Sequence, residues 1–153
     1  MSDPETRVVS ARIEVAAPAP RVFELIADPA AQPRWDGNDN LVRSEPGQRV
    51  RRAGQVFTTH LTNGMVRENH VVDFVEGVRI AWRPAEPGLA PPGHQWSFEL
   101  ETLEPGRTRV THTYDWSELT DEGRMPRARA TTSERLLASL ERIRDLAEDD
   151  RRG

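Results

Sequence analysis

The sequence of 153 residues contains neither cysteine nor lysine, and each absence removes a class of chemistry. Without cysteine the chain has no disulfide, no thiolate nucleophile and no sulfur ligand for a metal. Without lysine it cannot form a Schiff base with a carbonyl substrate. Histidine, carboxylate and hydroxyl side chains remain as the groups that could support catalysis.

Long apolar runs are also missing, and none approaches the roughly 20 residues that a membrane-spanning helix needs. Residues 1–5 are acidic and lack the apolar core of a secretory signal, so we expect a cytoplasmic protein without membrane insertion. A net charge of −4 without a long block of one sign argues against nucleic acid as the main partner. The length favours one domain over residues 1–153, ordered from about 7 to 148, as a monomer or homodimer.

The first part of the chain predicts a strand and two short helices. Residues 7–15 alternate between apolar and polar side chains, which is typical of a half-buried strand. Pro20 suits the first turn of a helix, and Asp28-Pro29 ends that helix. A second short helix, about residues 29–34, leads to Trp35.

Six further strands and three hairpins are predicted in the middle of the chain. The dipeptides Asn63-Gly64, Glu76-Gly77 and Pro105-Gly106 are turn signals. Strands joined by such short turns are antiparallel neighbours. The strands are predicted at about residues 40–46, 53–62, 65–75, 78–84, 93–103 and 107–117.

The last segment predicts one long helix over about residues 126–148. Its apolar residues recur at helical spacing and form a stripe. A seven-stranded antiparallel sheet and a striped helix must bury their apolar faces against each other. The fold class is therefore α+β, and the strong twist of such a sheet leaves room for an internal pocket. The stripe consists of Leu136, Leu137, Leu140, Ile143 and Ala147.

The hairpins predict which side chains face the helix. A two-residue turn at Asn63-Gly64 sets Phe57 opposite His70 and Thr59 opposite Glu68, all on the inner face. A slip of one residue would reverse this assignment. The other two hairpins, with three-residue loops, predict these inner pairs: His70 with Trp82, Phe98 with His112, Trp96 with Tyr114, and His94 with Trp116.

The predicted inner surface is aromatic and apolar with a few polar groups, which is the usual composition of a small-molecule site. We therefore expect a small hydrophobic or aromatic ligand between sheet and helix. The residues predicted to bind it are Trp35, Phe57, Thr59, Trp82, His94, Trp96, Phe98, His112, Trp116 and Leu140.

Several stretches of the sequence resemble the START-like, or SRPBCC, superfamily, and within it the bacterial polyketide cyclase/dehydrase-like branch. The resemblance covers about residues 7–147 and implies the helix-grip fold, in which a curved sheet wraps a long C-terminal helix over a deep cavity. The superfamily includes carriers and receptors as well as cyclases, so fold alone does not decide the function. The matching stretches include Ile13–Pro18, Val22–Leu25, Pro33–Trp35, Gly54–Phe57, His70–Phe74, Arg79–Trp82, Trp96–Leu100 and Arg109–Ser117.

Two functions follow as hypotheses. In the first, the protein is a cofactor-independent enzyme of polyketide cyclase or dehydratase type, with Glu68 and His70 transferring protons and Tyr114 orienting the substrate. In the second, it is a non-catalytic carrier or sensor of a lipid-like or aromatic molecule. The histidines and Glu68 have the atom types of metal ligands, but no closely spaced pair exists, so we expect neither metal nor cofactor.

Overall fold

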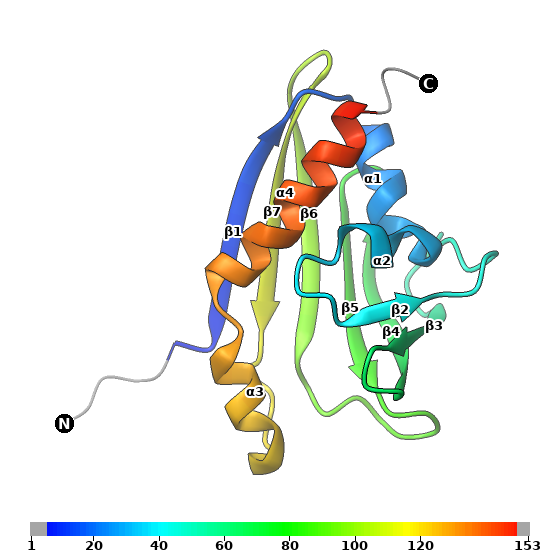
Figure 1. The fold of residues 1–153 in the computed structure, drawn as a ribbon, viewed down its shortest axis with the longest axis vertical. Coiled ribbons are helices and arrows are strands. Elements are labelled where there is room, and N and C mark those ends of the chain that lie inside the picture. The colour runs from blue at the N-terminus through cyan, green and yellow to red at the C-terminus, as the bar shows by residue number, and fades with distance from the viewer. Residues whose placement is uncertain (1–5, 150–153) are drawn as a thin grey trace.

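Seven antiparallel strands form one curved sheet, and a C-terminal helix crosses its concave face (Figure 1). The computed structural model describes residues 6–149, and the strand order is β1-β7-β6-β5-β4-β3-β2. This confirms the predicted α+β helix-grip architecture. The strands are β1 (Val8–Val15), β2 (Leu41–Arg43), β3 (Val56–Leu61), β4 (Val66–Val75), β5 (Arg79–Ala85), β6 (Gln95–Glu104) and β7 (Arg107–Asp115). The helices are α1 (Ala19–Ala27), α2 (Gln32–Trp35), α3 (Met125–Ala130) and α4 (Ser133–Asp149), with short 3-10 turns η1 (Pro29–Ala31) and η2 (Glu122–Arg124).

The segment after β1 folds as the prolines and Asp28 predict. Pro20 lies in the first turn of α1, and the Asp28 carboxylate accepts a hydrogen bond from the Ala30 amide at 3.1 Å to start η1. Trp35 then donates its indole N–H to the Leu25 carbonyl at 2.7 Å. This bond satisfies the polar end of the indole and holds its apolar rings against the core.

The C-terminal helix is not continuous, which corrects the prediction of one helix over residues 126–148. Thr131 is extended, with φ −82° and ψ 105°, and it separates α3 from α4. Thr132 caps the new helix, because its hydroxyl accepts from the Arg135 amide at 3.4 Å and its carbonyl accepts from the same amide at 3.1 Å. Threonine is favoured at such a cap position because it competes with the helical backbone elsewhere.

The pairing of β3 with β4 is shifted by one residue from the predicted register. Phe57 lies opposite Asn69, and Thr59 lies opposite Arg67. The turn contains three residues, since the Leu61 amide donates to the Met65 carbonyl at 2.8 Å and Gly64 has a left-handed φ of 86°. A three-residue loop with a left-handed glycine is the next commonest hairpin after the two-residue form.

The other two hairpins differ in how far their strand pairing agrees with the prediction. A bulge at Val72 shifts β4 against β5, so Trp82 pairs with Val71 and not with His70. The last hairpin has the predicted pairs Phe98–His112 and Trp96–Tyr114. Its turn is shorter than predicted, and a bulge between Thr102 and Glu104 supplies the extra residue that keeps both apolar faces inward.

Buried side chains form two clusters between the sheet and the helices. The larger cluster packs α1 and α4 on the sheet and includes Phe23, Ile80, Leu140 and Ile143. The smaller cluster lies under α3 and the start of α4 and consists of Tyr114, Trp116, Leu119, Met125, Ala128 and Leu136. The smaller cluster spans the break between α3 and α4, and the candidate site lies beside this break.

Candidate functional site

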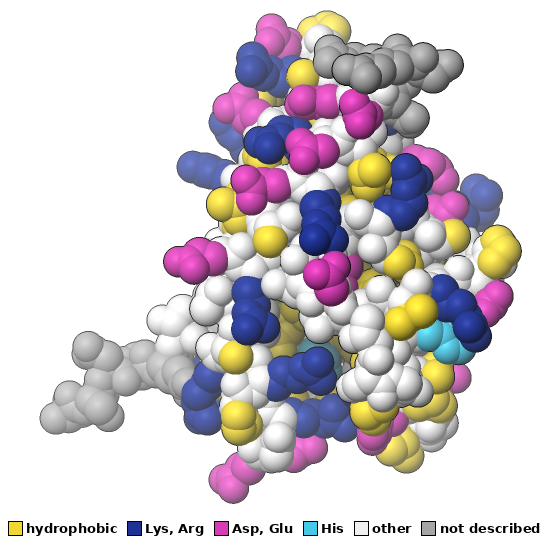
Figure 2. All heavy atoms as spheres, viewed as in Figure 1, with side chains coloured by type: hydrophobic (Ala, Val, Ile, Leu, Met, Phe, Trp, Pro, Cys, Tyr) yellow, Lys and Arg dark blue, Asp and Glu magenta, His cyan; other side chains and the backbone are white. Residues whose placement is uncertain are grey.

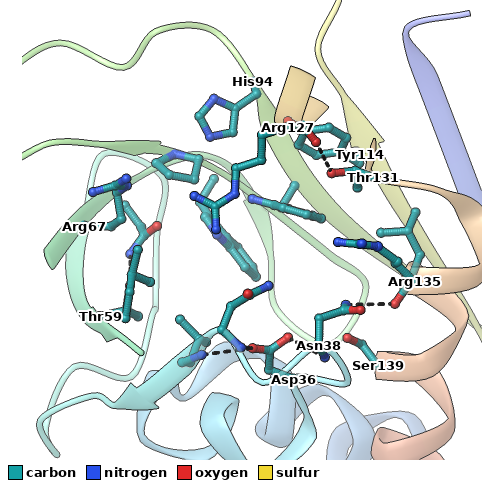
Figure 3. Close-up of a pocket in the computed structure, with 18 of the residues that line it drawn as sticks. Asp36, Asn38, Thr59, Arg67, His94, Tyr114, Arg127, Thr131, Arg135 and Ser139 are labelled. Carbon is teal, nitrogen blue, oxygen red and sulfur yellow. Dashed lines mark hydrogen bonds between the residues drawn. The ribbon is translucent and has the colours of Figure 1, made fainter. Parts of the chain in front are cut away.

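A cavity of about 400 Å³ opens between the sheet, the loop after α2, and helices α3 and α4. Figure 2 shows the corresponding hollow below the middle of this face, with basic side chains on its border and apolar side chains visible inside. The volume lies within the range of small-molecule sites, about 300–1,000 Å³. Figure 3 shows that strands, the Asp36–Asn38 loop and both C-terminal helices contribute side chains.

Most residues predicted to bind a ligand line this cavity. Phe57, Trp116 and Leu140 do not line it and are buried behind its walls. Phe57 packs edge-on against Trp82 with ring centroids 5.4 Å apart, and Trp116 belongs to the smaller cluster. Those at the cavity are Trp35, Thr59, Trp82, His94, Trp96, Phe98 and His112, and Tyr114, predicted to orient a substrate, lines it as well.

Glu68 and His70 lie on the outer face of the sheet, which corrects their predicted inward position. The one-residue shift of β4 turns both side chains away from the cavity. The Glu68 carboxylate accepts a hydrogen bond from the Gly88 amide at 2.9 Å and so fixes the loop after β5. His70 pairs across the sheet with Val56 and Arg83, and its Nε2 is buried with no hydrogen-bond partner among residues 6–149.

The same shift brings Arg67 and Asn69 into the cavity, although neither was predicted as a site residue. Asn69 donates through Nδ2 to the Phe57 carbonyl and to the Thr59 hydroxyl, both at 3.1 Å. These bonds satisfy a buried amide and rigidify the wall formed by β3 and β4. Correct recognition of the three-residue turn would have predicted both residues.

One wall of the cavity is a continuous set of aromatic contacts across β5, β6 and β7. Phe98 stacks on His112 with centroids 3.9 Å apart and planes at 7°, and it stacks on Trp82 at 5.9 Å. Trp96 contacts Tyr114 at 4.4 Å. Such contacts restrict the rings, so this wall presents a preformed aromatic surface.

The titratable groups of this wall are held neutral near pH 7. Burial lowers the pKa of His112 to about 4, although its Nδ1 lies 2.9 Å from the Ser97 carbonyl. Burial first, and then the positive charges of nearby arginines, lower the pKa of His94 to about 4. Burial raises the pKa of Tyr114 to about 12. Each group disfavours its charged form because the site is poorly solvated.

The loop after α2 closes another side of the cavity and is fixed by Asp36. Its carboxylate accepts from the amides of Asn40 at 2.6 Å, Leu41 at 3.0 Å and Asn38 at 3.2 Å. The Asn38 side chain in turn donates to the Arg135 carbonyl at 3.1 Å (Figure 3). The loop is thereby attached to the first turn of α4.

Arginines at the cavity were not predicted as site residues. Besides Arg67, they are Arg124 on η2, Arg127 on α3 and Arg135 on α4. The sequence signal for the last two is the Thr131-Thr132-Ser133 run, because the break it causes brings both helices to the cavity. Within residues 6–149 no group of three or more side chains has the arrangement of a metal site, and no helix is long and apolar enough to cross a membrane.

Curated relatives with similar sequences have no described function. The chain is 33% identical over 114 residues to an uncharacterised protein of Mycobacterium tuberculosis strain H37Rv, and a second strain has one that is 28% identical over 119 residues. Each match covers 71% of this chain and 47% of the relative. The chain therefore spans about half the length of the curated relatives it matches.

Solved structures with the same fold come from several bacteria. An aromatase/cyclase of Streptomyces sp. R1128 superposes with a TM-score of 0.66 at 22% identity, covering 93% of each chain. A protein of Mycobacterium smegmatis has a TM-score of 0.68 at 17% identity, covering 98% of this chain and 96% of its own. The Aha1 dimer of Colwellia psychrerythraea has a TM-score of 0.63 at 20% identity, covering 92% and 96%. At these identities the likeness shows the fold alone.

The match to a known protein family covers nearly all of the described residues. The profile of the family called polyketide cyclase/dehydrase and lipid transport matches residues 6–148, from before β1 to the last turn of α4. This match agrees with the resemblance found in the sequence. The chain belongs to the polyketide cyclase/dehydrase and lipid transport family, within the START-like or SRPBCC fold.

Proposed function

We propose that this protein binds one small, largely aromatic molecule in the cavity and acts as its carrier or sensor. The observation that carries the proposal is the aromatic wall of Trp82, Phe98, Trp96 and Tyr114 around about 400 Å³ of space. A ligand ring stacked on this wall would cover aromatic surface that water solvates poorly, and it would make close contacts with the wall. The proposal requires neither a metal nor a cofactor.

The protonation states of the site favour binding over acid–base catalysis. A general acid or base works best with a pKa near the operating pH. His94 and His112 have pKa values of about 4 and Tyr114 of about 12, so none changes its charge near neutrality. Glu68 and His70 face away from the cavity, so the predicted proton-transfer pair would not reach a ligand bound there.

Cyclase or dehydratase chemistry is a second candidate, and Tyr114 supports it. No residue in the described range 6–149 hydrogen-bonds to the Tyr114 hydroxyl, although the side chain is only 5% exposed and lines the cavity. A neutral phenol in this position can donate to a substrate carbonyl and polarise it. In that case Tyr114→Phe would abolish turnover of a poly-β-ketone, whereas His70→Gln on the outer face would preserve it.

A neutral two-ring probe tests the binding proposal directly. We expect 2-naphthamide to quench tryptophan emission with saturation at one site, because Trp82 and Trp96 line the cavity. Native mass spectrometry of protein purified from cells should also recover a bound molecule chemically unchanged. Absence of saturable quenching, together with empty protein in the mass spectrum, would contradict the proposal.

Two substitutions on α3 provide a matched comparison. Ala128 is 1% exposed and lines the cavity, so Ala128→Phe should occupy ligand space and weaken 2-naphthamide binding at least about tenfold. Ala130 lies on the same helix but is exposed and away from the cavity, so Ala130→Phe should bind normally. Thermal unfolding of both variants checks that the difference reflects binding and not loss of structure.

A further inference from the structure

The mouth of the cavity gathers positive charge in a chain whose net charge is −4. Arg67, Arg124, Arg127 and Arg135 line it from four different elements, and Asp36 is the acidic side chain among the lining residues. Basic side chains border the hollow in Figure 2. This concentration is local, because acidic and basic side chains alternate over the surface of α4 above it.

Asp36 does not neutralise these arginines, because its carboxylate is already engaged. Both oxygens accept hydrogen bonds from backbone amides of its own loop, at 2.6 to 3.2 Å. A carboxylate that accepts three amide N–H bonds has little capacity left for a guanidinium. The acidic group at the cavity therefore has a structural role in the loop.

Among residues 6–149, three of the four arginines have no carboxylate partner. Arg124 pairs with Glu86 at 3.3 Å and with Asp121 at 3.1 Å. No acidic side chain in the described part of the chain forms an ion pair with the other three arginines. Elsewhere on the molecule an arginine is fully paired, as Arg49 is with two glutamates at 3.0 and 2.8 Å.

The unpaired guanidinium groups lie around one space. Figure 3 shows Arg127 reaching into the cavity from α3 and Arg135 from α4, with Arg67 on the opposite wall. Burial, and then the positive charge of Arg124 and Arg127, lower the pKa of Arg67. Arg67 and Arg127 are thus close enough to disfavour each other's charge, and a bound anion would relieve that repulsion.

We propose that the natural ligand carries an oxyanion group, a carboxylate or a phosphate, which Arg67, Arg127 and Arg135 bind at the mouth. This inference rests on the proposed function, since the aromatic part of the same ligand would lie on the buried wall. Guanidinium groups bind carboxylate and phosphate through paired, charge-assisted hydrogen bonds. The site is therefore amphipathic along its depth, with the exposed Arg127 and Arg135 outside and the fully buried Phe98 inside.

Probes with the same ring system and different charge separate the contribution of the oxyanion to binding from that of the rings. We would titrate the full chain with 2-naphthoate, 2-naphthyl phosphate and 2-naphthamide and follow tryptophan emission and heat. At least one of the two anions should bind about tenfold or more tightly than the neutral amide. The affinity of that anion should fall as salt is raised, while that of the amide stays constant. The tighter anion identifies the oxyanion as carboxylate or phosphate.

Substitutions test whether the preference for anions over the neutral amide comes from the named arginines. Arg127 and Arg135 are exposed, so the double variant Arg127→Gln/Arg135→Gln should fold normally. We expect it to lose the anion preference, bringing the affinity ratio close to one, without changing amide binding. Arg12→Gln, on an exposed position of β1 away from the cavity, removes one charge elsewhere and should preserve the ratio.

The outcomes distinguish this inference from the function on which it rests. Equal, salt-independent binding of anion and amide to the wild type would overturn the oxyanion site and leave aromatic binding intact. Failure of all three probes to bind would overturn both. An anion preference that survives in the double variant would show that these arginines are not its source, and it would equally overturn the assignment.

Discussion

Gly37 lies where the loop after α2 passes directly against the backbone of α4. A Cβ atom at this position would be 2.5 Å from the Ala138 carbonyl carbon, far inside the usual contact distance. The Gly37 amide donates to the Ser139 hydroxyl at 3.0 Å, which holds the two segments together. The Ala138 carbonyl carbon belongs to the main chain of α4, and the Ser139 side chain is attached to the same helix. Neither can therefore move away from Gly37 at low cost.

We predict that Gly37→Ala destabilises the protein by about 1–3 kcal/mol, the usual range for an overpacked contact. It should also weaken binding of 2-naphthamide, because the loop that shifts forms one side of the cavity. The measurements are urea denaturation and tryptophan quenching. Gly123→Ala is the control for the denaturation measurement alone, because Gly123 itself lines the cavity and its Cβ would meet only the flexible Asp121 carboxylate at 3.3 Å. Equal stability of the two variants would contradict the tight contact.

Residues also mark the limit of what the sequence could predict. The turn character of the segment after Trp35 follows from its glycine and asparagines. Its contact with α4 does not, because Gly37 and Ser139 are 102 positions apart and no local pattern connects them. The role of Asp36 likewise could not be predicted from the sequence, because it depends on the backbone amides that its carboxylate accepts from.

At the scale of elements, local sequence signals predicted the existence and order of the strands better than they predicted which face of each strand is buried. Each of the seven strands occurs near its predicted position, because alternation and turn residues are local properties. The face of β4 was wrong, since one extra loop residue before Met65 inverts Glu68 and His70 against Arg67 and Asn69. The face of β6 was right, because its bulge and its shorter turn compensate each other.

The C-terminal helix shows a second limit at this scale. Its apolar stripe begins at Leu136, inside α4, and gives no information about residues 126–132. The competing signal was the Thr131-Thr132-Ser133 run, whose hydroxyls favour caps over helix interiors. The interruption matters for the candidate site, because it directs Arg127 and Arg135 toward the same cavity from two helices.

Removing the cap tests whether this interruption is specified locally. We expect Thr132→Ala to cost about 1 kcal/mol of stability, because the Arg135 amide loses its side-chain acceptor. The first turn of α4 should loosen, so 2-naphthoate should bind more weakly while 2-naphthamide changes less. Thr120→Ala, at an exposed loop position, is the control for loss of a threonine. Chemical denaturation showing no difference between the two variants would remove Thr132 from the capping role.

At the scale of the whole molecule, the cavity exists because the hydrophobic core is divided into two clusters. The larger cluster joins α1 and α4 to the sheet, and the smaller cluster joins α3 to β7. The aromatic wall bridges them, since Trp96 packs against both clusters. A core with two anchored ends can keep a cavity open between them, because collapse would require one cluster to give up its contacts.

This arrangement buries a histidine of β7 in the wall of the cavity, with a consequence for stability in acid. His112 is 4% exposed and stacks on Phe98, and its pKa is lowered to about 4 from the usual 6.5. Above pH 6.5 the imidazole is neutral in both the folded and the unfolded chain. Between pH 6.5 and 4 only the unfolded chain takes up the proton, so the free energy of unfolding falls as the pH falls.

We predict that His112 alone accounts for a loss of up to about 3 kcal/mol over this window, since each pH unit contributes about 1.4 kcal/mol per group. His112→Phe keeps an aromatic ring against Phe98 and removes the titration. Its curve of unfolding free energy against pH should therefore be flatter than that of the wild type between pH 6.5 and 4. Thr120→Ala, a substitution without a titratable group at an exposed loop position, should leave the wild-type slope. Parallel curves for wild type and His112→Phe would mean that the buried imidazole does not control acid stability.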